Sequence, residues 1–300
     1  MTLPAGAEPL RLRHVGADAK WVVHLDVDAL LQSRVGKALE AKVGPDLDRG
    51  VRELNRHLGV DYDWRRIHGL TLYGSAYGTP DHPKGVLLIH SDLDWKAGFE
   101  AALNRQAELG QATDGPVQRL REGPVALFSL DRKGFAALVS KRLAVVGASR
   151  EEVEQATKVL RGEAPNRRQK ADGLEVPRPR DGALLFVVAA EGFASEVPLP
   201  PRARVLQMTD ALQATVREVG GKLVTEVGLR TKDAQISQQV EQLIQGLKAL
   251  VALSGEQRPE VQRLAQGLDV RRDGRRVEVS LALPLDWVEQ MIREGQPKAD

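Results

Sequence analysis

The sequence predicts an α+β protein made of two similar halves, each with an antiparallel or mixed sheet and helices packed on one face. Three observations support this fold class. Short segments with alternating apolar residues are followed by segments whose apolar residues recur at i, i+3 and i+4. An acidic residue recurs where the first pattern changes to the second. The order of expected elements in 134–160 matches that in 267–292, which favours an internal repeat.

The expected domain organisation follows from the same patterns. The first half covers 20–161 and the second half covers 183–295. Between them, 162–182 is rich in Pro, Gly and charge and lacks periodicity, which predicts an exposed linker. Residues 1–19 precede the first pattern, and we expect them to form an N-terminal tail.

Composition excludes several classes of function. The chain has 300 residues, a net charge of +2 and no cysteine. A nearly neutral chain has no overall field that favours nucleic acid, and the lack of cysteine excludes disulfides, thiol nucleophiles and cysteine-ligated zinc. The longest apolar run, 183–190, is far shorter than the roughly 20 residues of a membrane-spanning helix. We therefore expect no nucleic-acid partner and no transmembrane segment.

The first half opens with WVVHLDVDALLQSRVGKAL, in which an alternating strand at 20–27 leads into a helix at 28–42. Asp28 stands at the junction. A carboxylate there accepts hydrogen bonds from first-turn amides and stabilises the helix by about 1 kcal/mol. The same reasoning predicts helix N-caps at three later junctions, namely Asp94, Asp233 and Asp286.

The remaining elements of the first half follow from the same two periodicities. We expect helices at 46–58, 94–109 and 150–161, and strands at 66–74, 84–91, 117–121, 124–129, 134–139 and 142–147. Ser149 and Glu152 form the S-x-x-E pattern of a capping box at the start of the last of these helices.

The second half is expected to alternate strands, hairpins and helices. In chain order, we expect a strand at 183–190, a hairpin turning at Gly220-Gly221, helices at 233–253 and 259–266, a hairpin turning at Asp273-Gly274, and a final helix at 286–294. The helix at 233–253 has an apolar stripe on one face and a neutral, glutamine-rich opposite face.

Four segments carry a resemblance to known sequences: GADAKWVVHLDVDALLQSRVGKAL, GLTLYGS, LAVVGASREEVEQATKVLRG and LIQGLKALVAL. They resemble a group of uncharacterised bacterial proteins of unknown function, often made with signal peptides. The resemblance implies no activity and transfers no catalytic residues. It implies a periplasmic or cell-envelope location if a signal peptide has been removed, and a cytoplasmic location is the alternative.

Two copies of an HxDxD pattern raise the question of a metal site. The copies contain His24 and Asp26 in one strand and His90 and Asp92 in another. Side chains two residues apart on a strand share a face but start roughly 6–7 Å apart, whereas metal ligands converge to about 2.0–2.2 Å from the ion. We interpret the four residues as structural, and a metal-dependent hydrolase using them is an alternative hypothesis.

Two further clusters are candidate binding sites. Tyr73, Tyr77 and His82 lie on or beside a long loop between two expected strands, where binding residues often occur. The second cluster is a hairpin tip with four arginines, Arg271, Arg272, Arg275 and Arg276. A turn at Asp273-Gly274 would place Arg272 opposite Arg275 and Arg271 opposite Arg276. Such like-charge pairs require solvent, carboxylate neighbours or a bound anion.

No catalytic signature accompanies these clusters. The sequence has no glycine-rich phosphate loop, no His-Glu-x-x-His motif and no nucleophile elbow. We therefore expect a non-enzymatic binding or interaction protein without a cofactor, whose partner is an unknown protein or small ligand. A small-ligand or lipid-type carrier is the first alternative, and the metal-dependent hydrolase is the second.

Overall fold

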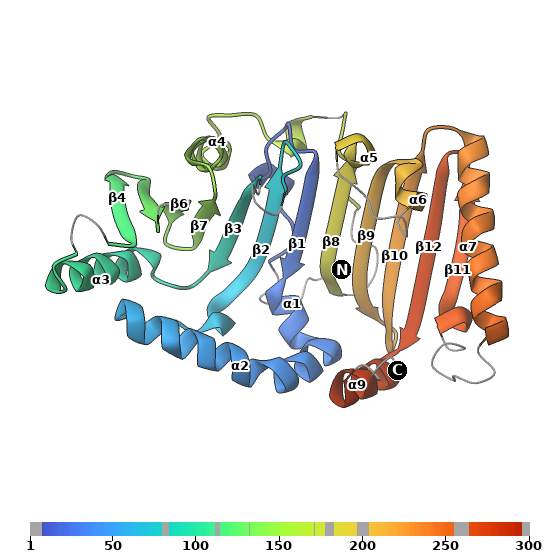
Figure 1. The fold of residues 1–300 in the computed structure, drawn as a ribbon, viewed down its shortest axis with the longest axis horizontal. Coiled ribbons are helices and arrows are strands. Elements are labelled where there is room, and N and C mark those ends of the chain that lie inside the picture. Colours follow the sequence, from blue (N-terminus) through green and yellow to red (C-terminus); the bar gives the residue numbers. More distant parts are fainter. Residues whose placement is uncertain are drawn as a thin grey trace. The chain divides into compact units, whose positions relative to one another are not determined.

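The computed structural model describes residues 8–79, 84–111, 115–131, 133–170, 172–177, 183–196, 204–254 and 264–295. Contacts divide the chain into two compact units (Figure 1). Unit 1 comprises Met1–Gln32 and Leu39–Ala171, and unit 2 comprises Ser33–Ala38 and Asp172–Asp300. Both units combine helices with antiparallel strands, which confirms the predicted α+β class.

Unit 1 is built on an antiparallel sheet with the strand order β1-β2-β3-β7-β6-β5-β4. The strands are β1 (Trp21–Asp26), β2 (Ile67–Gly74), β3 (Val86–Ser91), β4 (Val117–Arg121), β5 (Ala126–Leu130), β6 (Gly134–Ser140) and β7 (Leu143–Gly147). Side chains alternate between buried and more exposed positions along β1 and most of β3. This alternation explains why the sequence pattern located these strands.

The helices of unit 1 pack through small, β-branched and aromatic residues. They are α1 (Val27–Gln32), α2 (Arg34–Leu58, whose first residues belong to unit 2), α3 (Trp95–Glu108) and α4 (Arg150–Leu160). Helix α4 lies on β3, β6 and β7 and buries Val153, Ala156 and Val159. On α3, Phe99 stacks on the buried Phe128 of β5 with ring centroids 4.3 Å apart.

Unit 2 has the antiparallel strand order β8-β9-β10-β12-β11. Its strands are β8 (Ala183–Glu191), β9 (Thr209–Val219), β10 (Lys222–Thr231), β11 (Leu268–Asp273) and β12 (Arg276–Pro284), and its helices are α5 (Phe193–Glu196), α6 (Arg204–Gln207), α7 (Ala234–Ser254) and α9 (Leu285–Glu294). Val240 of α7 packs with Leu229 and Val277 of the sheet. No described helix is both long and apolar enough to cross a membrane.

The two units share an order of elements. In unit 1 the chain forms β1, two helices, β2, β3, α3, then the hairpin β6-β7 and α4, with β4 and β5 added before the hairpin. In unit 2 it forms β8, two helices, β9, β10, α7, the hairpin β11-β12 and α9. The strand orders β1-β2-β3-β7-β6 and β8-β9-β10-β12-β11 therefore correspond.

Two of the four predicted helix caps are confirmed. The Asp94 carboxylate accepts a hydrogen bond from the Ala97 amide at 3.0 Å, and the Asp233 carboxylate accepts one from the Ile236 amide at 2.8 Å. Each of these two aspartates stands immediately before its helix, since α3 begins at Trp95 and α7 begins at Ala234.

The other two predicted caps are wrong because their helices begin earlier than the pattern suggested. Helix α1 begins at Val27, so Asp26 is the residue whose carboxylate accepts from the Ala29 amide, at 2.9 Å. Asp28 lies in the first turn instead. Helix α9 follows Pro284, which has no capping side chain, and Asp286 also lies in the first turn.

The helices expected at 28–42 and 46–58 are also placed differently. After α1 ends at Gln32, helix α2 continues through the expected gap, with Pro45 inside it. Proline lacks the amide for one intrahelical hydrogen bond, so the sequence around it favoured a break. The shorter helix expected at 259–266 lies mostly outside the described residues.

The arginine hairpin has a different register from the predicted one. Its two-residue turn is Gly274-Arg275, because Asp273 pairs with Arg276. Gly274 adopts a φ of +54°, which glycine does at little cost. Arg271 consequently lies opposite Glu278 and Arg272 opposite Val277, so the predicted like-charge pairs do not form.

The expected tail and linker are more ordered than their composition indicated. In the described part of 1–19, Val15 is 0% exposed. In 162–182, Arg167 and Leu174 are buried, and Asn166 caps a short 3-10 helix at Arg167–Gln169. Both segments therefore contain buried residues, contrary to the prediction of an exposed linker. The division between the units falls within 162–182, after Ala171.

Candidate functional site

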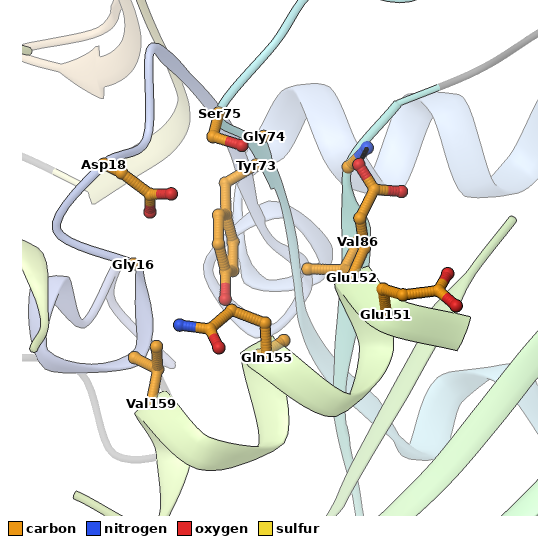
Figure 2. Close-up of a pocket in the computed structure, with 12 residues that line it drawn as sticks. Gly16, Asp18, Tyr73, Gly74, Ser75, Val86, Glu151, Glu152, Gln155 and Val159 are labelled. Carbon is orange, nitrogen blue, oxygen red and sulfur yellow. Dashed lines mark hydrogen bonds between the residues drawn. The ribbon is translucent and has the colours of Figure 1, made fainter. Parts of the chain in front are cut away.

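A cavity of about 240 Å³ opens in unit 1 where β2 ends, β3 begins and α4 starts (Figure 2). Four segments line it: Gly16 and Asp18 before β1, Tyr73–Ser75 at the end of β2, Gly85 and Val86 at the start of β3, and one side of α4 from Glu151 to Val159. The wall thus combines residues that lie far apart in the sequence.

Tyr73 occupies the centre of this lining. Its ring lies between Asp18 and Glu152, and its hydroxyl ends beside Gln155 (Figure 2). The residue is 6% exposed. The Gly16 amide lies near its hydroxyl, but the hydroxyl proton has no acceptor among the described residues. Burial and the Asp18 carboxylate raise the pKa of Tyr73, and the nearby Gly16 amide offsets this only in part. Tyr73 therefore presents a neutral hydroxyl to the cavity.

Glu152 is held by the glycine at the start of β3. Ser149 caps α4 by accepting a hydrogen bond from the Glu152 amide at 3.4 Å, which confirms this half of the predicted capping box. The Glu152 side chain extends to Gly85 instead of returning to Ser149, and its Oε1 accepts from the Gly85 amide at 3.0 Å. The second carboxylate oxygen is buried without a hydrogen-bond partner in the described chain.

The backbone conformation and the close packing at the start of β3 require a glycine at position 85. Its φ is +101°, and an added Cβ would lie 2.5 Å from the Tyr73 carbonyl oxygen and 2.8 Å from the Trp21 indole. Trp21 is itself fixed, because its Nε1 donates to the Ala76 carbonyl at 2.9 Å. A larger residue at 85 would move the amide that orients Glu152.

Part of the expected linker supports the opposite wall. The Arg167 amide donates to the Val15 carbonyl at 2.8 Å, and the Ala17 amide donates to the Pro165 carbonyl at 3.2 Å. These bonds position Gly16 and Asp18 beside Tyr73. No sequence pattern predicted this role, because it depends on pairing between distant segments that lack periodicity.

Tyr73, Tyr77 and His82, the residues predicted as a binding cluster around the long loop, are not shown to form one site. Tyr73 lines the cavity. Tyr77 does not line it, and its hydroxyl donates to the Lys20 carbonyl at 3.3 Å. His82 lies outside the described residues.

The four predicted arginines point to different partners. Arg271 pairs with Asp269 at 2.8 Å, Arg272 pairs with Glu241 at 2.9 Å, Arg276 pairs with Glu175, and Arg275 donates to the Lys232 carbonyl at 3.4 Å. The structure therefore does not direct these guanidinium groups toward one common site.

Three of the HxDxD residues, His24, Asp26 and His90, are buried on β1 and β3, whereas Asp92 follows β3 and is exposed. Asp26 on β1 and His90 on β3 are both paired with Gly69 of β2. Glu8 covers Gly69, where an added Cβ would lie 3.1 Å from the Glu8 Cγ. Both ring nitrogens of His24 are engaged, Nδ1 with the Thr71 hydroxyl at 2.9 Å and Nε2 with the Glu8 carbonyl at 3.0 Å.

His90 and Asp92 have protein partners as well. His90 Nδ1 lies 3.4 Å from Glu8 Oε1, and Asp92 contacts His68 Nε2 at 3.0 Å and Arg142 Nε at 3.1 Å. Within the described ranges, no three or more His, Asp or Glu side chains are arranged to hold a metal ion. The sequence pattern missed Glu8 and His68, since neither belongs to a motif.

Burial determines the ionisation of these side chains. It lowers the pKa of His24 to about 4 and that of His90 to about 3. Burial likewise raises the pKa of Glu8 and Asp26. For His68, burial alone would lower the pKa, but hydrogen bonds to Asp28 and Asp92 outweigh it and raise the pKa.

Comparisons with known proteins give a likeness in fold. No protein-family model matches the chain, and no curated protein matches it. Crystal form III of TP0453 is similar with a TM-score of 0.50 and 9% sequence identity, over 96% of this chain and 99% of that chain. Form I has a TM-score of 0.48 and 9% identity over 96% and 98% of the two chains, and form IV has 0.47 and 9% over 95% and 96%. At this identity, the likeness concerns the fold alone.

Proposed function

We propose that this chain is a non-enzymatic binding protein that holds a small polar ligand in the cavity beside Tyr73. One observation carries the proposal: the hydroxyl of a residue only 6% exposed borders a cavity, and its proton has no acceptor in the described chain. Buried polar groups are nearly always hydrogen-bonded, and leaving one unpaired costs about 1–3 kcal/mol. A ligand oxygen that accepts from Tyr73 would remove this cost.

Glu152 supports the proposal independently. One of its carboxylate oxygens is fixed by the Gly85 amide, and the other is buried without a donor. A ligand that bears both a hydrogen-bond acceptor and a donor would satisfy Tyr73 and Glu152 together. The cavity thus presents a defined polar pattern on a wall that also contains Ala156 and Val159.

The chemistry of the lining favours binding over catalysis. The lining contains no histidine, lysine or cysteine, and no base contacts the Tyr73 hydroxyl within the described chain. A general base must lie within hydrogen-bond reach of the proton that it removes, and the raised pKa of Tyr73 also keeps that proton in place.

The size of the cavity limits the ligand. A volume of about 240 Å³ lies below the roughly 300–1,000 Å³ typical of sites for drug-sized molecules. This favours a fragment-sized molecule or a single side chain of a partner over a lipid chain, which was the carrier alternative.

A fragment screen by two-dimensional NMR tests the proposal. The ¹⁵N-labelled chain is titrated with a library of small polar compounds, and the amides of Gly16, Gly74 and Gly85 report on the cavity. We expect binders that shift these signals and that bind Tyr73→Phe about tenfold more weakly, because one hydrogen bond is lost. Tyr77→Phe is the matched control and should bind as the wild type does.

Two outcomes would contradict this proposal. In one, no compound shifts the cavity amides of the folded wild type. In the other, Tyr73→Phe binds every hit as tightly as Tyr77→Phe does, which would show that the hydroxyl is not part of a binding site.

A further inference from the structure

We infer that the ligand of this cavity carries a guanidinium group close to a carbonyl oxygen, as an arginine residue does. This inference rests on the proposed binding function and specifies the chemistry of its ligand.

The carboxylates at the cavity form no direct ion pair within the described chain, although Arg150 and Lys84 lie close enough to Glu151 to help lower its pKa. Asp18, Glu151 and Glu152 all line it, and none of them forms an ion pair with a described lysine or arginine. Glu151 accepts from the Ser149 hydroxyl at 2.8 Å, and Glu152 accepts from the Gly85 amide. A half-buried carboxylate with one oxygen unpaired attracts a charged donor most strongly, because hydrogen bonds between ions are about twice as strong as neutral ones.

The cavity offers an acceptor and a donor in addition to this charge. The Tyr73 hydroxyl needs an oxygen to receive its proton, and the buried oxygen of Glu152 needs a donor. An arginine residue supplies both, since its carbonyl accepts and its planar guanidinium donates in the fork that matches a carboxylate. One such side chain also suits a cavity of about 240 Å³.

Unit 2 already shows this chemistry at the corresponding end of its own sheet, where β9 ends, β10 begins and α9 starts. There, Glu218 accepts hydrogen bonds from the amides of Arg34 and Val35 at 3.1 and 3.2 Å. The Arg34 guanidinium contacts Asp286 at 2.6 Å and Glu289 at 2.8 Å, both on α9. Acidic residues beside the strand ends of unit 2 thus hold an arginine, whereas the acidic residues of unit 1 border a cavity.

Paired probes test the inference. N-acetyl-L-arginine amide and its neutral isostere N-acetyl-L-citrulline amide are titrated into the ¹⁵N-labelled full chain. We expect the arginine probe to bind at least tenfold more tightly than the citrulline probe. Glu152→Gln should abolish this preference, because the glutamine side chain carries no charge. Its side-chain carbonyl oxygen can still accept a hydrogen bond from the Gly85 amide. Glu154→Gln is the matched control, because Glu154 is on the same helix but pairs with Arg121 and Arg150 outside the lining.

A further titration with a peptide distinguishes two sources of the guanidinium group, a partner protein and a small molecule. If Gly-Gly-Arg-Gly-Gly binds more tightly than the blocked arginine, the ligand is a segment of a partner protein. If the two bind equally, the ligand is a small molecule. Either result supports the guanidinium inference.

The guanidinium inference can be wrong while the proposed binding function is still correct. Equal binding of the arginine and citrulline probes, or an unchanged preference in Glu152→Gln, would overturn the guanidinium inference. If neutral fragments shift the cavity amides but the arginine probe does not, the cavity is a binding site of different chemistry. If no compound shifts them, the proposed function fails too.

Discussion

His24 illustrates how single residues are determined by their surroundings in this protein. It is 2% exposed, with one ring nitrogen engaged by Thr71 and the other by Glu8. Burial lowers its pKa to about 4, so the ring is neutral in the folded chain at pH 7. In the unfolded chain the same ring has its ordinary pKa of 6.5. Below pH 6.5, the unfolded state therefore binds more protons at this position than the folded state does.

This difference predicts acid sensitivity. The stability due to neutral His24 is fully present above pH 6.5 and is lost as the pH falls toward 4, by about 1–2 kcal/mol between pH 7 and 5. The raised pKa values of Glu8 and His68 have the opposite effect, because they make the folded state bind more protons as the pH falls. The contribution of His24 is therefore measured by comparing the wild type with a His24 variant. Urea denaturation should show a smaller loss from pH 7 to 5 in His24→Gln. Equal losses in the two proteins would contradict this explanation.

A second prediction at this scale concerns the helix caps. Asp94→Ala should lower the free energy of unfolding by about 1 kcal/mol, because the Ala97 amide loses its acceptor. Asp286→Ala is the control, since Asp286 caps no helix and its side chain is 88% exposed in its pair with Arg34. Urea denaturation measures both. A loss at Asp286 as large as that at Asp94 would argue against the capping role.

At the scale of the element, periodicity located most strands and helices but did not fix where they begin. Burial alternates along β1, so its pattern was visible in the sequence. The starts of α1 and α9 depend on which backbone amides find acceptors, and the pattern placed both starts too late. Helices were predicted at 28–42 and 46–58 with a gap between them, whereas α2 continues through that gap with an exposed Pro45 inside it.

The start of β3 depends on a glycine. Gly85→Ala should lower the free energy of unfolding by more than about 1 kcal/mol, because alanine is strained at positive φ and its Cβ would contact the Tyr73 carbonyl. Gly110→Ala is a matched control with a φ of +71° and open space around it. Thermal unfolding measures both variants. Equal destabilisation would mean that the close approach at Gly85 contributes nothing.

At the scale of the whole molecule, the sequence indicated two α+β halves but only one member of the candidate site. Tyr73 was found because it borders a long loop. Asp18 and Glu152 could not be found, since they reach the cavity through contacts between segments far apart in the chain. The assignment of Ser33–Ala38 to unit 2 was likewise invisible, because it depends on Glu218 and on the acids of α9.

The central claim, a ligand site at Tyr73, is most directly tested by ¹⁹F NMR of the chain labelled with 3-fluorotyrosine. The chain has only three tyrosines, Tyr62, Tyr73 and Tyr77, and Tyr→Phe variants assign each signal. When the polar fragment library and N-acetyl-L-arginine amide are added, we expect saturable shifts of the Tyr73 signal, with the other two unchanged. A Tyr73 signal that no compound moves, in a chain that remains folded, would contradict the binding function proposed for this cavity.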